Sequence, residues 1–192
     1  MAISGGTLTG GVAGGTGALT IQIYGLDENY DEQNETVNLN GTTSVNTVNS
    51  YTMIYRMIVR TAGSGGQNAG DITATAATDG TVTAQITATY NQTTMAIYQV
   101  PRKKSLFIRS YYLSTNDATG STNILLYVKP FGEAWQLKHI IGTKASGNSA
   151  FTHVFSPNFK IEEKSLVKIS ANTTVDNKDV SAGFDSVLHS DQ

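Results

Sequence analysis

The sequence predicts an all-β protein: a single-domain antiparallel β-sandwich, jelly-roll-like, that follows an extended Gly-rich N-terminal arm. Residue usage is the first reason, because Thr is the commonest of the 192 residues and Gly the next, whereas the helix formers Glu, Lys, Leu and Arg are sparse. The second reason is that short apolar segments recur along the chain with turn residues between them. No stretch of ten residues shows a convincing amphipathic helical pattern, so a sandwich or barrel is the expected architecture.

The chain is expected to divide into a flexible arm, residues 1–17, and one β-sandwich domain, residues 18–192. The arm is rich in Gly, Ser and Thr, and its apolar residues stand alone at Ile3, Leu8 and Val12. Such a segment can be flexible by itself. It can also become ordered by lying on a neighbouring subunit, with these three residues as anchors.

Strands are predicted from residue 18 onward. Leu19, Ile21 and Ile23 alternate with polar residues, which is the period of a half-buried strand. Asn40-Gly41 predicts a hairpin turn in which both residues adopt positive φ. Residues 51–60 form a nearly continuous apolar run, which predicts a strand covered on both faces. Further strands are expected over residues 71–77, 81–89, 95–100, 105–113, 123–129, 135–141, 151–155 and 159–169.

The Gly-rich segment RTAGSGGQNAGDITAT, residues 60–75, has the composition of a phosphate-binding loop. However, Asn68 stands where a dinucleotide fingerprint needs its third glycine, and a strand rather than a helix follows. No lysine lies nearby, as a Walker loop would require. We therefore expect a connection between two strands.

An acidic loop is expected over residues 26–35, with Asp27, Glu28, Asp31 and Glu32 as its candidate contact residues. Its first residues have the spacing that opens a calcium-binding loop. Glu32 replaces the glycine needed at the sixth position, and the twelfth position lacks a bidentate glutamate. A solvated loop or a charged contact with another subunit is the expected role, and no metal or cofactor is predicted.

Charge and cysteine content exclude several classes of function. The net charge of -2 gives no electrostatic reason to expect nucleic acid or an anionic membrane as partner. Cysteine is absent, so disulfides, thiolate metal sites and cysteine catalysis are excluded. The N-terminus lacks the pattern of a secretory signal, and no apolar run is long enough to span a bilayer. We therefore expect the protein to be synthesised in the cytoplasm of a cell.

No catalytic motif is present. The histidines His139, His153 and His189 form no HExxH pair, and no Gly-x-Ser-x-Gly elbow occurs. The first two fall inside predicted strands, where a hydrogen-bonded structural imidazole is expected. The protein is therefore predicted not to be an enzyme.

Two surface features have alternative interpretations. The basic cluster Arg102, Lys103 and Lys104 follows a proline at a predicted strand start. It is either a solvated turn or a docking patch for an acidic surface, for which the acidic loop of another copy has the complementary charge. Several aromatic residues would form a sugar-binding platform if exposed on one face, although strand alternation favours core packing for most of them. They are Tyr111, Tyr112, Tyr127, Phe131 and Trp135.

Three segments resemble a family of virion structural proteins of tailed bacteriophages, notably aquatic ones: ETVNLNGTTSV, RTAGSGGQNAGDITAT and NQTTMAIYQVP. The resemblance covers roughly residues 25–101. Family members more commonly have Pro-x-Gly-Lys after Tyr-x-Val-Pro, whereas this chain has PRKKS, which leaves the role of that turn open.

The resemblance implies a non-enzymatic protein of the phage particle. The short chain, its Gly-rich arm and its lack of fibre-like repeats favour a capsid decoration or cement protein that binds the major capsid protein, or other virion proteins, and copies of itself. The alternatives are a module of a head fibre or tail that binds carbohydrate or a host receptor, and an adaptor at the head–tail junction. The expected location is the virion, at the capsid surface rather than the tail.

Overall fold

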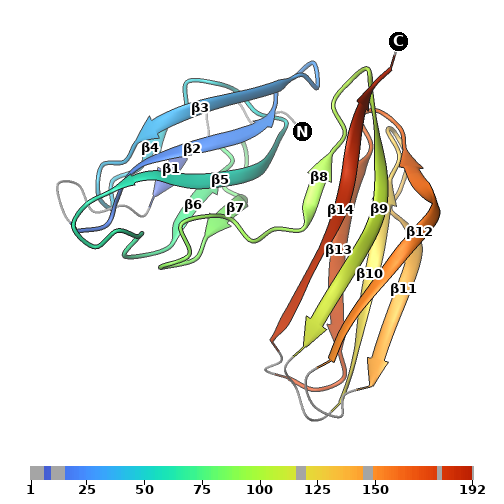
Figure 1. The fold of residues 1–192 in the computed structure, drawn as a ribbon. Helices are drawn as coiled ribbons and strands as arrows, with labels where there is room; N and C mark the ends of the chain where they lie inside the picture. The colour runs from blue at the N-terminus through green and yellow to red at the C-terminus, as the bar shows by residue number, and fades with distance from the viewer. Residues whose placement is uncertain (1–6, 10–15, 116–119, 145–148, 177–178, 192) are drawn as a thin grey trace. The chain divides into compact units, whose positions relative to one another are not determined.

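The computed structural model describes residues 7–9, 16–115, 120–144, 149–176 and 179–191. The described chain contains strands and turns but no helix, which confirms the all-β fold class. It divides into two compact units, residues 1–95 and 96–192 (Figure 1).

The first unit contains two antiparallel sheets. One has the order β3-β2-β5 and the other β4-β1-β6-β7. Their strands are β1 (Thr7–Thr9), β2 (Ala18–Leu26), β3 (Glu32–Asn38), β4 (Val45–Asn46), β5 (Met53–Ala62), β6 (Ile72–Thr75) and β7 (Val82–Ile86).

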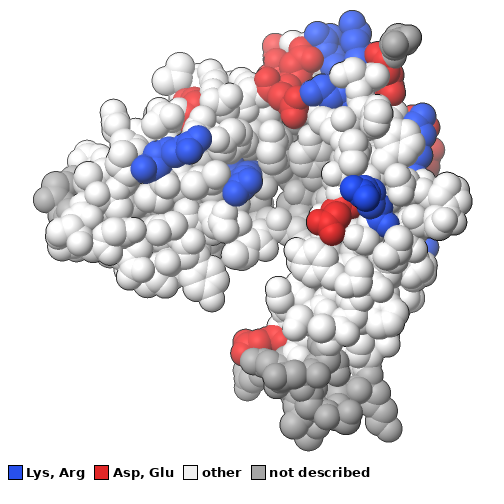
Figure 2. All heavy atoms as spheres, in the orientation of Figure 1, with Lys and Arg blue, Asp and Glu red and all other residues white. Residues whose placement is uncertain are grey.

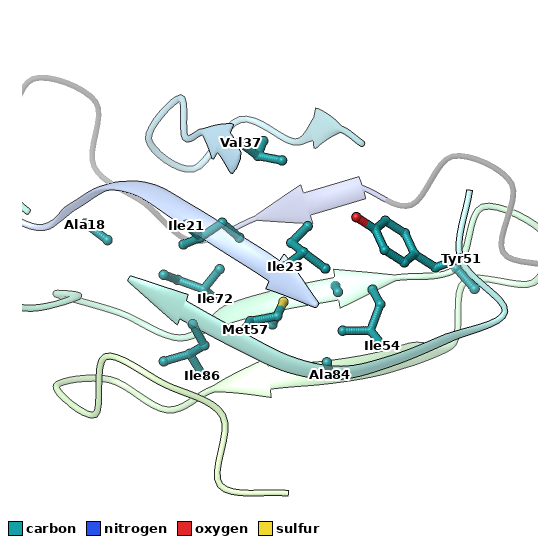
Figure 3. Close-up of a cluster of buried hydrophobic side chains, with 12 residues drawn as sticks. Ala18, Ile21, Ile23, Val37, Tyr51, Ile54, Met57, Ile72, Ala84 and Ile86 are labelled. Carbon is teal, nitrogen blue, oxygen red and sulfur yellow. The ribbon is translucent and has the colours of Figure 1, made fainter. Parts of the chain in front are cut away.

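The core of the first unit is formed by apolar side chains from both of its sheets (Figure 3). Ile21 and Ile23 of β2 are fully buried, as the alternation in the sequence predicts. Ile72 of β6 and Ile86 of β7 are equally buried on the second sheet. The strand predicted over 51–60 is only partly as expected, because Tyr51, Ile54 and Met57 are buried whereas its other side chains are half-buried or exposed.

The prediction of a separate arm over residues 1–17 is wrong for the residues that the structure describes there. Strand β1 pairs with β4 and β6, and Leu8 lies opposite Val45 and Ala74. The carbonyls of Thr16 and Gly17 accept hydrogen bonds from the Gly-rich loop. These residues therefore belong to the first unit. Two of the proposed anchors, Ile3 and Val12, lie outside the described residues.

The second unit also contains two antiparallel sheets, ordered β11-β10-β13-β8 and β12-β9-β14. Its strands are β8 (Ile97–Gln99), β9 (Lys104–Thr115), β10 (Ser121–Lys129), β11 (Gln136–Lys144), β12 (Ser149–Ile161), β13 (Leu166–Thr173) and β14 (Val180–Ser190). Its core includes Leu106, Ile108, Leu126 and Val167, which come from both sheets.

Strand pairing in the second unit is nested. Strand β10 pairs with β11, β9 with β12, and β8 with β13. Two further pairs, β10 with β13 and β9 with β14, complete the sheets. This is the pattern of a long antiparallel ribbon folded over into two layers.

The single domain predicted over residues 18–192 differs from the two units observed. Each unit buries a hydrophobic cluster of its own. No described strand of one unit pairs with a strand of the other. Regularly spaced strands with turns between them have the same sequence pattern in one sandwich or in two, so the boundary near residue 95 had no local signal.

Two turns also differ from expectation. Residues 40–43 form a tight turn, closed by a hydrogen bond from Thr43 N to Asn40 O. Only Gly41 has positive φ, and the turn joins strands of different sheets instead of a hairpin. Residues 156–158, expected to separate the strands over 151–155 and 159–169, instead lie inside β12, where Pro157 falls at an irregularity in the register; the Ser156–Pro157 peptide bond is cis.

Candidate functional site

A groove of about 750 Å³ lies on the outer face of sheet β12-β9-β14. Phe107 of β9 pairs directly with Lys160 of β12 on one side and with Val187 of β14 on the other. Phe107 alternates with the buried Leu106 and Ile108, so its ring is on the side away from the core. We call this feature the sheet groove; it is lined by Phe107, Arg109, Asn158, Lys160, Val187, His189, Ser190 and Asp191.

The sheet groove forms where both neighbours of β9 lose regular pairing. On β12 the register shifts between Val154 and Phe159, and on β14 it shifts between Asp185 and Ser186. Both irregularities fall beside Arg109, which has no direct partner on either strand. Irregularities of this kind re-aim side chains and interrupt the flat surface of a sheet.

The polar groups of the sheet groove differ in how they are held. Within the described part of the chain, neither the Arg109 guanidinium nor the Asn158 amide has a hydrogen bond or ion pair. Lys160 Nζ lies 3.1 Å from a carboxylate oxygen of Glu162. Asp191 accepts hydrogen bonds from Ser105 Oγ at 2.9 and 3.0 Å.

The aromatic part of the sheet groove is Phe107. The imidazole of His189 lies edge-on to it, with ring centroids 5.5 Å apart. This contact links β9 to β14 and holds the phenyl ring in place beside the exposed Val187.

A second surface, the outer apolar face, lies on sheet β11-β10-β13-β8. Ile124, Leu126 and Val128 of β10 are buried, so Leu125 and Tyr127 between them point away from the core. Their neighbours on β11 are Ile140 and Leu137, which are 49% and 45% exposed. Lys168 of β13 adds a cation–π contact, with Nζ 4.5 Å from the ring centroid of Trp135 and 5.4 Å from that of Tyr127.

An aromatic cluster with two histidines joins β9, β11 and β12. Tyr111 Oη lies 2.5 Å from His139 Nδ1, and the rings of His139 and His153 stack with centroids 4.2 Å apart. Burial, together with the neighbouring His153, lowers the pKa of His139 below its usual value of 6.5. His139 is therefore hydrogen-bonded, as predicted.

The basic turn of Arg102, Lys103 and Lys104 is hydrogen-bonded to acidic residues of its own unit. Lys103 has a φ of 56°, and its backbone N–H donates to the Glu163 carboxylate at 2.5 Å. The N–H of Asp191 donates to Lys103 O at 2.9 Å. Lys104 opens β9. The turn therefore has a local structural role beside any role in docking.

The acidic turn joins β2 to β3. One carboxylate oxygen of Asp27 accepts the backbone N–H groups of Asn29 and Asp31 at 2.8 and 2.9 Å. This carboxylate therefore shapes the hairpin. Glu32 opens β3, so the loop is shorter than predicted, and Glu28 lies exposed at the tip. Among the described residues, no three His, Cys, Asp or Glu side chains are placed to hold a metal ion.

Charged residues are sparse on the molecular surface, as the composition predicts. Most of the face seen in Figure 2 belongs to residues that are neither acidic nor basic. The sheet groove is not predictable from the sequence, because its residues come from three strands and only strand pairing brings them together. The single local signal was the Ser-Pro-Asn interruption, residues 156–158, inside an otherwise strand-like segment.

Comparison of the chain with protein-family models, with curated proteins and with solved structures found no match. Among the described residues, no helix has the length and apolar character to cross a membrane.

Proposed function

We propose that this chain is a non-enzymatic structural protein of a tailed-phage virion, a capsid decoration or cement protein that attaches to the assembled head. The observation that carries the proposal is the outer apolar face. Trp135, Leu137 and Ile140 are exposed there beside the half-buried Leu125 and Tyr127. A sheet that presents large apolar side chains on its outer face, in addition to those in the core, is suited to being covered there by a partner.

The outer apolar face is the proposed contact with the major capsid protein or another virion protein. Full burial of one large apolar side chain contributes about 1.5–3 kcal/mol. A few such residues give modest affinity at one binding site. Overall binding becomes stronger when the same contact is repeated at many sites of a capsid lattice. A protein that binds only the assembled shell stabilises that shell by mass action.

The topology of the second unit also supports the proposal. Its nested pairing is what a seven-stranded jelly roll would have, with β8, β13, β10 and β11 in one layer and β12, β9 and β14 in the other. Jelly rolls serve as viral capsid domains and as lectin domains. Together with the resemblance of residues 25–101 to phage virion proteins, this favours a place in the particle.

The test has two parts. Mass spectrometry and cryo-electron microscopy of purified particles should find the protein on the head surface in a copy number that matches the capsomers. Purified heads that lack the protein should bind added wild-type chain. The double variant Leu137→Glu/Ile140→Glu should bind at least about tenfold more weakly, because 1.4 kcal/mol already corresponds to tenfold.

The matched control is Val154→Glu. Val154 is 67% exposed on the other sheet of the same unit, outside the outer apolar face. It should attach as the wild type does. Absence of the protein from particles would overturn the proposal, and equal attachment of the double variant would exclude the outer apolar face as the contact.

A further inference from the structure

We propose that the sheet groove binds an acidic saccharide: a sugar unit that carries one carboxylate, as in the uronic and sialic acids of cell-surface polysaccharides. This site lies on sheet β12-β9-β14, whereas the proposed attachment to the head uses sheet β11-β10-β13-β8. The inference therefore goes beyond the proposed function and does not depend on it.

Arg109 is the proposed carboxylate partner. Its guanidinium is exposed in the groove, and no described residue pairs with it. A guanidinium presents a planar fork of N–H donors that matches a carboxylate in two-point geometry. Lys160 lines the same groove and adds a second positive charge, partly offset by Glu162.

Asn158 and Asp191 suit the hydroxyl groups of a sugar. The Asn158 amide has no described partner, so it is available both to donate and to accept. The Asp191 carboxylate accepts from Ser105 Oγ, and its remaining lone pairs can accept from sugar hydroxyls. Ser190 contributes a further hydroxyl to the lining.

Phe107 and Val187 supply apolar surface between these polar groups. They are direct partners on β9 and β14, and the His189 ring makes a T-shaped contact with the phenyl ring. Binding sites of this kind combine apolar surface with a few placed polar groups that fix orientation. The C–H face of a pyranose ring fits such a surface while its hydroxyls reach the rim.

The same charges disfavour an acidic peptide. Asp191 places a negative charge in the groove that repels the successive carboxylates of a Glu- or Asp-rich segment. A saccharide with a single carboxylate can direct that group to Arg109 and present hydroxyl donors to Asp191. The positive and the negative group of the groove then each have a complementary group of the ligand.

The experiment is calorimetric titration of the full chain with three acidic probes that each carry one carboxylate: galacturonic acid, glucuronic acid and N-acetylneuraminic acid. At least one should bind saturably, in the range of micromolar to about 10 mM expected for small ligands in open sites. Its methyl ester, which lacks the charge, should bind at least about tenfold more weakly. A hexaglutamate peptide should not compete.

Arg109→Gln should weaken the same binding at least about tenfold. The matched control is Arg56→Gln, because Arg56 is an exposed arginine of the first unit, where its guanidinium bonds to Gln92 at 3.1 Å. It should bind as the wild type does. Chemical-shift changes on titration should map to β9, β12 and β14.

Failure of all three sugars to bind would overturn the inference, and so would wild-type affinity in Arg109→Gln. Effective competition by hexaglutamate would assign the groove to an acidic peptide instead. Arg109→Gln should leave attachment to heads unchanged, so this result and the test of the proposed function can fail independently.

Discussion

Asn68 and Asn91 hold each other by a reciprocal pair of hydrogen bonds. The Asn68 N–H donates to Asn91 Oδ1 at 3.0 Å, and the Asn91 N–H donates to Asn68 Oδ1 at 2.9 Å. Asn68 is fully buried, and its Nδ2 also donates to the carbonyls of Gly70 and Thr87, both at 2.9 Å. The Gly-rich loop is therefore fastened to the segment that follows β7.

Asn68→Asp should destabilise the first unit strongly. The new carboxylate cannot donate, so the carbonyls of Gly70 and Thr87 lose their donor and face a negative charge instead. Each buried unsatisfied group costs about 1–3 kcal/mol. A fall in melting temperature of about 10 °C or more follows if 1 kcal/mol corresponds to roughly 4–8 °C in a unit of this size.

Circular dichroism on heating measures the effect, with Asn34→Asp as control. Asn34 is exposed, and its Oδ1 accepts from Gln22 at 2.9 Å, a bond that aspartate keeps. Equal melting temperatures of the two variants would contradict a role of Asn68 as the anchor of the loop.

Gly25→Ala should also destabilise the first unit, for a steric reason. A Cβ at Gly25 would lie 2.2 Å from Met53 O and 2.6 Å from Cδ1 of the buried Tyr51. The backbone of β5 must move to make room, at a cost of about 1–3 kcal/mol. Urea unfolding should show a lower midpoint.

Gly70→Ala is the control for Gly25→Ala. A Cβ at Gly70 meets nothing within 4 Å, and its φ is not in the left-handed region. Alanine there restricts the unfolded chain and should raise the free energy of unfolding by about 0.4–1 kcal/mol. Destabilisation by both variants to the same extent would show that the approach of β5 to Gly25 is not the cause.

The stability of the second unit should fall as the pH is lowered below 6.5, the usual pKa of a histidine. The pKa of His139 is lowered in the folded state. As the pH falls below 6.5, this histidine therefore becomes protonated in the unfolded chain before it does in the folded protein, which favours unfolding. The stability that comes from keeping His139 neutral is fully present above pH 6.5. It is lost as the pH falls through the lower pKa that His139 has in the folded state. Protonation would also place a charge beside His153.

His139→Gln removes the titration and should flatten this part of the pH dependence of the melting temperature. His189→Gln serves as the control, because that imidazole lies outside the cluster and contacts Phe107. Unchanged pH dependence in His139→Gln would exclude His139 as its source.

The strands themselves were largely predictable, because their burial follows the sequence period. Ile21 and Ile23 are buried as predicted, and Ile124, Leu126 and Val128 alternate with half-buried or exposed residues along β10. Local chemistry therefore identified the elements and the all-β class.

Non-local features were not predictable by the same means. The pairing of β1 with β6 joins residues more than 60 positions apart, so Thr7–Thr9 had the composition of a flexible arm and no local sign of a strand. From the sequence, Asn68 is only the residue that departs from a nucleotide-binding motif. Its role as an anchor is not visible there, because its partner Asn91 is 23 residues away. The sheet groove depends on shifted registers on two strands, which no single segment encodes.

The nested pairing of the second unit also constrains the time course of its assembly. Strand β9 lies between β12 and β14, both of which follow it in the chain. At about 5–20 residues per second, the ribosome needs roughly 4–15 s to make the segment from Thr115 to Ser190. Strand β12 is complete once Ile161 has been made, but β14 is complete only at Ser190, so one edge of β9, the strand that carries the apolar Leu106, Ile108 and Leu113, stays unpaired for the whole interval. The nascent chain therefore passes through a period in which the unpaired edge of β9 is open to aggregation, and this period ends only when β14 has been made.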